Sequence, residues 1–346
     1  MLRFGCALLL HLEGANVMLD TVIGLAADNL LSPIILFFVL GLLASFLRSD
    51  LSIPEAVAKG MSIYLLFAIG YKGGVSVSDH GIDQTLLSTL VMGIVLSFAL
   101  PLIAFGLLQV MTKLSRTDAA AVAGHYGSIS IVTFVAATSV LQSQGIASEG
   151  YMVAIAAAME APAILSALWL VSRGSKPSAE ETEEREGLLR EILLNGSIVM
   201  LVGSFLIGFI TGKDGLAEIE SFIVSPFKGV LCLFLLDMGL VAGRGLRSSR
   251  GVLTVGLISF GVLMPVVGSL LGLLASMLVG LSLGGTVLMM TLSASASYIA
   301  VPAAMRVALP EANPSVYLTM SLGVTFPFNL TLGIPLYLTL ATLIGN

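Results

Sequence analysis

Long stretches without charged side chains constrain the fold of this chain more than any other feature of its sequence. Many of them reach about 20 residues, which is long enough for a helix to cross the hydrocarbon core of a bilayer. Only 11% of the 346 residues are charged, whereas a soluble domain carries about 25%. Because lipid satisfies no backbone polar group, an open structure can cross it only as helices. The sequence therefore predicts an all-α polytopic membrane protein.

Ten transmembrane helices are expected. Their approximate ranges are 32–48, 54–73, 84–112, 117–141, 151–172, 193–212, 220–243, 251–281, 284–308 and 314–344. The third and the eighth are longer than one perpendicular crossing requires, so we expect them to tilt or bend. Pro101 and Pro265 are the obvious places for a bend, because proline removes a helical hydrogen bond.

One charged segment divides the chain. Residues 173–192 read RGSKPSAEETEEREGLLREI and are too polar to enter a membrane. They separate a first group of five spans, 32–172, from a second group, 193–346. We interpret the segment as a solvated linker; a short surface helix from Glu183 to Arg190 is the alternative.

Basic residues predict the orientation. If the linker is cytoplasmic, 12 of the 16 basic residues lie inside and 4 lie outside. The inside set is Arg48, Lys59, Lys113, Arg116, Arg173, Lys176, Arg185, Arg190, Arg244, Arg247, Arg250 and Arg306, and the outside set is Arg3, Lys72, Lys213 and Lys228. Loops rich in Lys and Arg stay in the cytoplasm. The expectation is therefore a cytoplasmic linker with both termini outside.

Residues 1–31 form an extracytoplasmic segment on this topology. Within it, residues 1–17 have one arginine and a short apolar run, which is weakly typical of a signal peptide. His11 and Glu13 interrupt that pattern. We favour a mis-assigned start, with Met18 as the true first residue, over a cleaved signal, and we expect residues 1–17 to be dispensable.

The two halves resemble each other weakly. Glycines spaced by four residues end the second and the seventh span, a proline bends the third and the eighth, and a serine pair interrupts the fourth and the ninth. The matching positions are Gly70 with Gly239, Pro101 with Pro265, and Ser128 with Ser295, at offsets of 169, 164 and 167. Because five is odd, the second half must enter from the opposite side. This pattern predicts two inverted five-helix repeats, an architecture common in secondary transporters; the alternative is a chance similarity, because glycine and serine are frequent in membrane helices.

Small polar residues interrupt spans four and nine near the middle, which predicts broken helices. The first interruption contains Gly127, Ser128 and Ser130, and the second contains Ser295, Ala296 and Ser297. A broken helix presents a new N-terminus inside the membrane, where N–H groups and the helix dipole favour an anion. In an inverted repeat two such N-termini converge. We expect these six residues to bind an anion; the alternative is that the serines only cap kinks and pack closely.

Acidic and amide side chains within the spans predict a cation site. Glu160 lies near the middle of span five, Asp237 lies inside span seven, and Asn329 occupies the position in span ten that corresponds to Glu160. An ionised carboxylate at the bilayer centre costs about 2.5–3.5 kcal/mol, and either Na⁺ or a proton would relieve that cost. The alternatives are a protonated, hydrogen-bonded Glu160 and an Asp237 that reaches the interface. For His125 we favour a packing or hydrogen-bonding role over a binding role.

Three stretches resemble the sodium-dependent bicarbonate transporter family, best known from cyanobacterial carbon concentration. They are IPEAVAKGMSIYLLFAIGYKGG at 53–74, SASYIAVPAAMRVALPEANPS at 295–315 and LGVTFPFNLTLGIPLY at 322–337. The resemblance implies ten spans in two inverted repeats, a homotrimer, and Na⁺-driven uptake of bicarbonate across a bacterial plasma membrane. It also implies that the crossovers hold substrate and ions, and that a PII-like protein can inhibit from the cytoplasmic face.

The chain departs from the cyanobacterial pattern at one place. Those members read Ser-Gly-Ser-Thr in the first crossover, whereas this chain reads Gly-Ser-Ile-Ser from Gly127 to Ser130, followed by Thr133. Glu160 also stands where they carry Asp. We therefore add Thr133 to the candidate cation ligands Glu160, Asn329 and Asp237.

Other function classes fit less well. An intramembrane enzyme needs a catalytic set such as paired aspartates, HExxH or a Ser/His protease motif, and the sequence has none. We expect no cofactor other than the coupling ion Na⁺ and no nucleic-acid partner. Two alternatives to bicarbonate symport stay open. One is a Na⁺- or H⁺-coupled carrier of another small anion such as a carboxylate, and the other is an anion channel.

Overall fold

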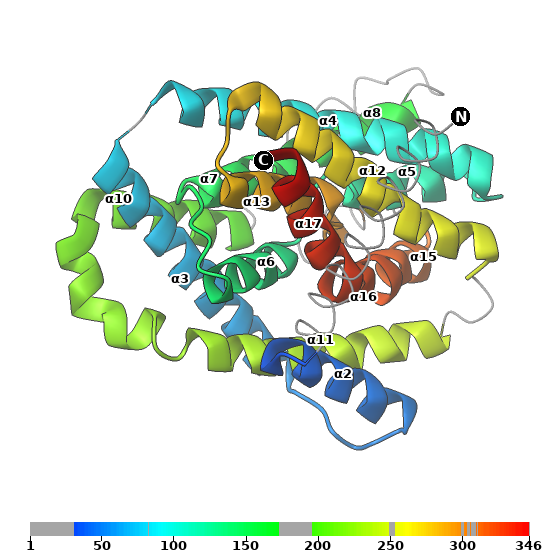
Figure 1. The fold of residues 1–346 in the computed structure, drawn as a ribbon. Coiled ribbons are helices and arrows are strands. Elements are labelled where there is room, and N and C mark those ends of the chain that lie inside the picture. The colour runs from blue at the N-terminus through cyan, green and yellow to red at the C-terminus, as the bar shows by residue number, and fades with distance from the viewer. Residues whose placement is uncertain are drawn as a thin grey trace, which may run out of the picture.

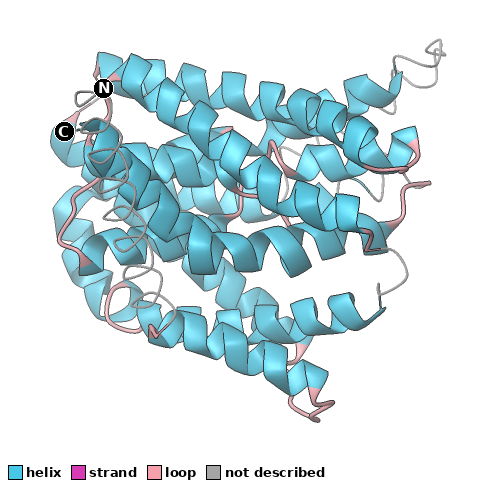
Figure 2. Cartoon of the chain, turned by 45° about the vertical axis from the view of Figure 1, so that its right-hand side comes forward, coloured by secondary structure: helices cyan, strands magenta, loops and turns pink. Residues whose placement is uncertain are grey.

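The computed structural model describes residues 31–172 except 82, then 196–248, 253–298, the single positions 301, 302, 305 and 309, and 311–345. All regular structure in these ranges is helical (Figure 1; Figure 2). The expectations for residues 1–17 and for the linker 173–192 fall on residues outside the described ranges.

Seven of the described helices are long and apolar enough to cross a membrane. They correspond to expected spans two, three, five, six, seven, eight and ten. Spans one, four and nine contain shorter apolar helices, Pro33–Phe46, Ile131–Ser143 and Leu283–Ala294. The all-helical, multi-pass character predicted from the sequence is confirmed.

The helices of the first half follow the expected spans. They are α2 (Pro33–Phe46), α3 (Glu55–His80), α4 (Gln84–Met111), α5 (Arg116–His125), α6 (Ile131–Ser143), α7 (Met152–Ala158) and α8 (Glu160–Ser172). Polar side chains start several of them, as the unpaired N–H groups of a first turn require. Ser32 caps α2, Asp83 caps α4 and Ser130 caps α6.

The second half contains α10 (Gly196–Ile223), α11 (Phe227–Ser248), α12 (Val255–Val279) and α13 (Leu283–Ala294). Its last span combines α15 (Pro314–Leu318), α16 (Phe326–Phe328) and α17 (Ile334–Gly345) with two π-helical segments, Thr319–Thr325 and Asn329–Gly333. The sequence predicts this span but not the π-helical segments, which often occur at functional sites.

Four helices form what we call the panel: α2, α3, α10 and α11. Helix α2 packs along α11, and α3 packs along α10. Figure 1 shows them along the lower and left margins, beside the other helices. Glycines allow the close approach, because a Cβ at Gly74 would collide with the backbone of Phe205, and one at Gly239 would collide with the carbonyl of Phe38.

The boundary between spans six and seven differs from the prediction. Helix α10 breaks at Gly212, whose φ of 60° and ψ of −151° suit only glycine. Residues 213–223 then return along α3, with Leu216 and Ile223 packed against its Tyr71 region. The expected span from 220 was wrong at its start, and the spanning helix begins at Phe227. Averaged hydropathy missed the boundary because one face of 213–223 is apolar.

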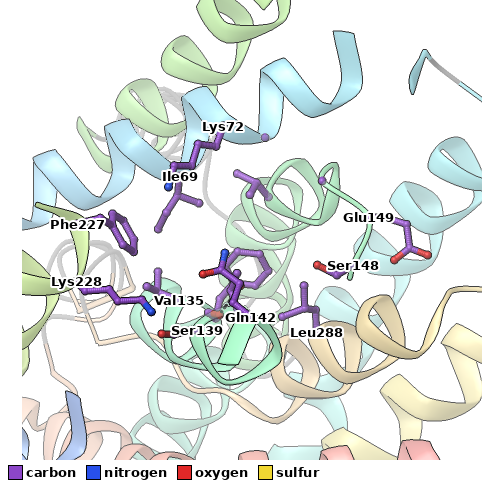
Figure 3. A pocket seen from close by; sticks show the side chains of 15 residues that line it. Ile69, Lys72, Val135, Ser139, Gln142, Ser148, Glu149, Phe227, Lys228 and Leu288 are labelled. Carbon is purple, nitrogen blue, oxygen red and sulfur yellow. Dashed lines mark hydrogen bonds between the residues drawn. The ribbon is translucent and has the colours of Figure 1, made fainter. Parts of the chain in front are cut away.

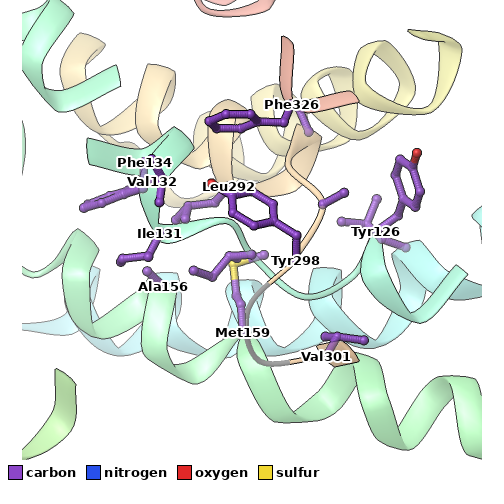
Figure 4. Close-up of a cluster of buried hydrophobic side chains, with 14 of the residues drawn as sticks. Tyr126, Ile131, Val132, Phe134, Ala156, Met159, Leu292, Tyr298, Val301 and Phe326 are labelled. Carbon is purple, nitrogen blue, oxygen red and sulfur yellow. The ribbon is translucent and has the colours of Figure 1, made fainter. Parts of the chain in front are cut away.

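Span five is also divided. Helix α7 ends at Ala158 and α8 begins at Glu160, with Met159 between them. Pro162 explains the division, because proline is tolerated in the first turn of a helix but not in its interior. Figure 4 shows the aromatic and aliphatic side chains that surround this level of the molecule, including Tyr126, Met159 and Phe326. The densest burial therefore lies around the two broken helices.

Candidate functional site

The first crossover joins α5 to α6 through residues 126–130. Its second half-helix is capped by its own serine, since the amide of Thr133 donates to Ser130 Oγ at 3.2 Å. Gly127 lies against α4, where an added Cβ would collide with Pro101 and with the carbonyl of Ser97. The glycine is therefore required by a close approach between helices, and the expected break in span four is present.

The second crossover begins where α13 ends at Ala294. Ser295, Ala296 and Ser297 follow without regular hydrogen bonding, and Ser295 has extended dihedral angles. Most of residues 299–310, which continue this span, lie outside the described ranges. The expected break in span nine is thus present at its first half-helix.

The two crossovers contact each other directly. The amide of Ser130 donates to Ser295 Oγ at 3.0 Å, and the amide of Ser297 donates to the carbonyl of His125 at 2.8 Å. The predicted anion-binding residues Gly127, Ser128, Ser130, Ser295, Ala296 and Ser297 are all buried. Residues more than 160 positions apart in the sequence are therefore brought together in one buried place.

Glu160 joins the first crossover. Its Oε2 accepts a hydrogen bond from Ser128 Oγ at 2.7 Å, and its side chain is only 8% exposed. Thr133, the candidate ligand from α6, donates through its hydroxyl to Ser130 Oγ at 2.9 Å. Carboxylate and hydroxyl oxygens are the donors that hard cations prefer.

Asn329 joins the second crossover from span ten. Its Nδ2 donates to the carbonyl of Ala294 at 2.9 Å, and its Oδ1 accepts from the hydroxyl of Tyr337 at 2.6 Å. The amide lies at the start of the second π-helical segment. Glu160 and Asn329 thus each contact the crossover of their own half.

Asp237 lies elsewhere. It is buried in α11, within the panel, where the neighbouring carbonyl of Leu236 faces Gly41 of α2. Among the described residues, no hydrogen bond or salt bridge connects Asp237 with either crossover. The structure therefore brings three of the four predicted cation ligands to the crossovers and leaves the fourth in the panel.

His125 is held by packing and by its own helix. Its ring stacks on Tyr317 with 4.7 Å between ring centroids, and Nδ1 lies 2.6 Å from the carbonyl of Ala121. Nε2 has no hydrogen-bond partner among the described residues. These contacts agree with the packing role that we favoured from the sequence.

The prolines of α4 and α12 supply polar groups that the sequence reasoning missed. Proline frees the carbonyl four residues before it. In α12 the carbonyl of Gly261, four residues before Pro265, accepts from Thr325 Oγ1 at 2.7 Å, and that hydroxyl pairs with Tyr126 at 2.7 Å. The four-residue spacing from proline was the signal that could have identified this network.

The matching place in α4 is also polar. Ser97, four residues before Pro101, donates through Oγ to the carbonyl of Met159 at 2.5 Å. Met159 is the residue at which span five divides. The bond therefore satisfies a backbone group that the division releases, one residue away from Glu160.

The family model of the Na⁺-dependent bicarbonate transporter superfamily matches residues 33–342, which is nearly the whole chain. The chain belongs to this superfamily. Membership makes it a membrane transport protein and not an enzyme, as expected from the three resembling stretches. No curated protein matches the chain.

Two cavities of this superfamily member lie between the panel and the crossover helices. The first, of about 210 Å³, reaches from Lys72 of α3 to α6 and Leu288 of α13 (Figure 3). The second, of about 320 Å³, lies between the start of α2, α6 and α17. Lys228 and Ser139 line both. Neither cavity is lined by a crossover serine.

Proposed function

We propose that the chain is a secondary active transporter that takes up bicarbonate together with Na⁺ across the plasma membrane. The pair of bonded crossovers, with Glu160 held by Ser128 at 2.7 Å, carries this proposal. Superfamily membership supports both the anion and the ion. The candidate cation ligands at the crossovers would hold Na⁺ as the coupling ion.

The start of α6 favours a monovalent anion. The first N–H groups of a helix have no carbonyl of a preceding turn to pair with, and Ser130 caps only that of Thr133. The helix dipole adds about half a positive charge there. Bicarbonate has one negative charge and three oxygens that can accept hydrogen bonds, which suits N–H groups and serine hydroxyls.

A Na⁺ ion bound beside the bicarbonate would explain why the two ions are transported together. A helix end compensates only part of a buried charge, and its effect fades within a turn. Na⁺ on Glu160, Thr133 and Asn329 would neutralise the remaining field. Each ligand would then tighten the other by the same factor, because coupling between sites is reciprocal.

We infer an inverted repeat of ten spans, and the packing of the helices supports it. In such a repeat, α2 corresponds to α10, and α3 corresponds to α11. The pair α2 and α11 therefore corresponds to the pair α10 and α3, and both pairs pack extensively. Ser97 and Gly261 each lie four residues before the proline inside their helix, and each bonds to its half's last span, Ser97 through its hydroxyl and Gly261 through its carbonyl.

The linker is proposed to be cytoplasmic and the termini extracytoplasmic. Two bonds support the grouping of the basic residues. Arg116 donates to the carbonyl of Leu170, which is close in sequence to the linker, and Arg247 donates to the carbonyl of Ser45, near Arg48.

Cysteine labelling tests this orientation. In a variant without the native cysteines, a cysteine at Ser178 should be labelled only after permeabilisation and one at Gln144 in intact cells. The reverse result would contradict this orientation.

Uptake of labelled bicarbonate into proteoliposomes tests the function. An inward Na⁺ gradient should drive saturable accumulation, and dissipating the gradient should remove it. Accumulation that follows a pH gradient and ignores Na⁺ would indicate proton coupling through Glu160. Accumulation of a small carboxylate in place of bicarbonate would show that the carboxylate is the substrate. Flux without saturation would indicate a channel. A homotrimer and a PII-like partner stay proposals that gel filtration and co-purification test separately.

A further inference from the structure

Two lysines from different panel helices line one cavity. Lys72 is in α3 and Lys228 is in α11, and both border the cavity of about 210 Å³ between the panel and α6. Figure 3 shows their side chains on the same side of the cavity, with Gln142 between them and Leu288. Two positive charges thus face one space that is accessible from the solvent.

The lysines are not neutralised by the described carboxylates. Neither forms a salt bridge with any of them, and the salt bridge of the described residues joins Lys213 to Asp79 instead. Among the described residues that line the cavity, the one acid is Glu149. Its two oxygens accept from the amide and hydroxyl of Ser282 at 2.7 and 2.9 Å, which holds it at the start of α13. Figure 3 shows it at the end of the cavity away from the lysines.

The position of Lys72 is fixed by its neighbour. Its ammonium lies 5.0 Å from the ring centroid of Phe227, the residue before Lys228. A cation over an aromatic face is attracted to it, so Lys72 is held in place. The opposite wall offers the hydroxyl of Ser139 and the amide of Gln142, which can donate hydrogen bonds.

The cavity borders α6, the helix that follows the first crossover. Its wall includes Phe134 and Val135 of α6, and Phe134 directly follows Thr133. It also includes Ser148, Glu149 and Gly150 of the loop between α6 and α7, which precedes span five and so lies at the opposite end of that span from the C-terminal end of α8. In the proposed orientation this end faces outside.

We propose that Lys72 and Lys228 form an outer anion-recruiting site that holds bicarbonate, a small monovalent oxyanion, before it moves along α6 to the crossovers. The inference rests on the proposed function, because it assigns an outer station for the same substrate. A volume of about 210 Å³ holds such an ion with several waters, since each water occupies about 30 Å³ in the liquid. Charges that line a cleft raise the local concentration of the opposite ion.

The test is the initial rate of labelled bicarbonate uptake into cells as a function of bicarbonate at fixed, saturating Na⁺. Lys72→Met and Lys228→Met should each raise the bicarbonate concentration for half-maximal uptake roughly three- to tenfold, as removal of one charge from a partly exposed site does. The maximal rate and the Na⁺ requirement should stay as in the wild type. Lys228→Arg should retain the wild-type value, and raising ionic strength with choline gluconate should weaken the wild type more than the double variant.

Lys213→Met is the matched control. It removes the same charge at the same end of the molecule, but from an exposed lysine paired with Asp79 outside the cavity. It should leave the half-maximal concentration unchanged. Because Lys228 is exposed, its variant should fold even if Lys72→Met does not, which gel filtration checks.

Two results would overturn the site. One is unchanged half-maximal bicarbonate in Lys228→Met and in the double variant. The other is an equal shift in Lys213→Met, which would assign the effect to general surface charge. Both leave the proposed function intact, provided that the wild type shows Na⁺-dependent uptake. If the wild type itself shows no Na⁺-dependent bicarbonate uptake, the proposed function is wrong and this inference falls with it.

Discussion

The two crossovers are built from similar residues but are held in different ways. In the first, the acid Glu160 accepts from Ser128, a residue of the crossover itself. In the second, the amide of Asn329 is fixed on both sides, by the carbonyl of Ala294 and by the hydroxyl of Tyr337. Among the described residues, one half therefore has a carboxylate with a single hydroxyl donor, and the other has a neutral amide whose nitrogen and oxygen each have a partner.

The difference assigns different roles to matching positions. A carboxylate carries a full charge that a cation can compensate, and Ser128 couples it to the proposed anion-binding segment. An amide has no charge, and the two bonds of Asn329 hold α13 and the last span together. We therefore expect Glu160 to dominate Na⁺ dependence and Asn329 to dominate the integrity of the second crossover.

Filling either crossover should have the largest effect. Ser130→Leu and Ser297→Leu each place a large side chain in a buried segment, where Ser130 is 4% and Ser297 is 2% exposed. Overpacking of such a site typically costs about 1–3 kcal/mol, and it would displace the anion as well. Both variants should lose Na⁺-driven bicarbonate uptake in proteoliposomes.

Ser143→Leu is the control, because Ser143 lies on the exposed end of α6. It should transport normally. Gel filtration of all three variants separates loss of transport from loss of assembly. If one crossover tolerates leucine with normal uptake, the substrate is bound in the other half alone.

Glu160→Gln should have the next largest effect, and this effect should be on the Na⁺ dependence of uptake. Glutamine keeps the size and can still accept from Ser128, but it removes the charge. Two unit charges about 4 Å apart interact by about 4 kcal/mol at an effective dielectric of 20, and about 1.4 kcal/mol changes affinity tenfold. We expect the Na⁺ concentration for half-maximal uptake to rise at least tenfold.

Asp237→Asn is the matched comparison, since it removes a buried carboxylate in the panel. It should leave the Na⁺ curve near that of the wild type. A large shift in Asp237→Asn with none in Glu160→Gln would place the cation in the panel and reverse the roles assigned above.

Asn329→Ala should act mainly on stability and less on Na⁺. It removes two buried hydrogen bonds, each with a typical net contribution of about 0.5–1.5 kcal/mol. The thermal midpoint of the purified protein should fall by several degrees, and half-maximal Na⁺ should rise only about threefold. A Na⁺ shift as large as that of Glu160→Gln would show that the two halves contribute equally to the cation site.

Much of the fold could be predicted from hydropathy, and the breaks in spans four and nine could be predicted from their glycine and serine residues. The runs around Pro101 and Pro265 correspond to α4 and α12, and the interruption at Ser128 is where α5 ends and α6 begins. These features are local, because chain length and backbone chemistry decide them. The start of α11 at Phe227 was missed because residues 213–223 have an apolar face against α3.

The contacts within the site were beyond sequence reasoning. The bond from Ser130 to Ser295 and the pairing of Tyr126 with Thr325 join distant segments. No spacing in one chain encodes them. The cavity lined by Lys72 and Lys228 was missed for a different reason. Both lysines entered the topology only as counted charges, and their convergence depends on how α3 and α11 pack.

Tyr337→Phe should have the smallest effect and completes the comparison. It removes the hydroxyl that donates to Asn329 Oδ1 at 2.6 Å and keeps the ring. The residue eight positions after Glu160 is Leu168, which has no hydroxyl, so the first half has no matching brace at that position. The bond to Ala294 remains, so the amide should stay in place. Half-maximal Na⁺ should change less than twofold, and the thermal midpoint should fall by less than in Asn329→Ala. A Tyr337→Phe variant as unstable as Asn329→Ala would mean that the tyrosine, and not the bond to the crossover, holds the second half together.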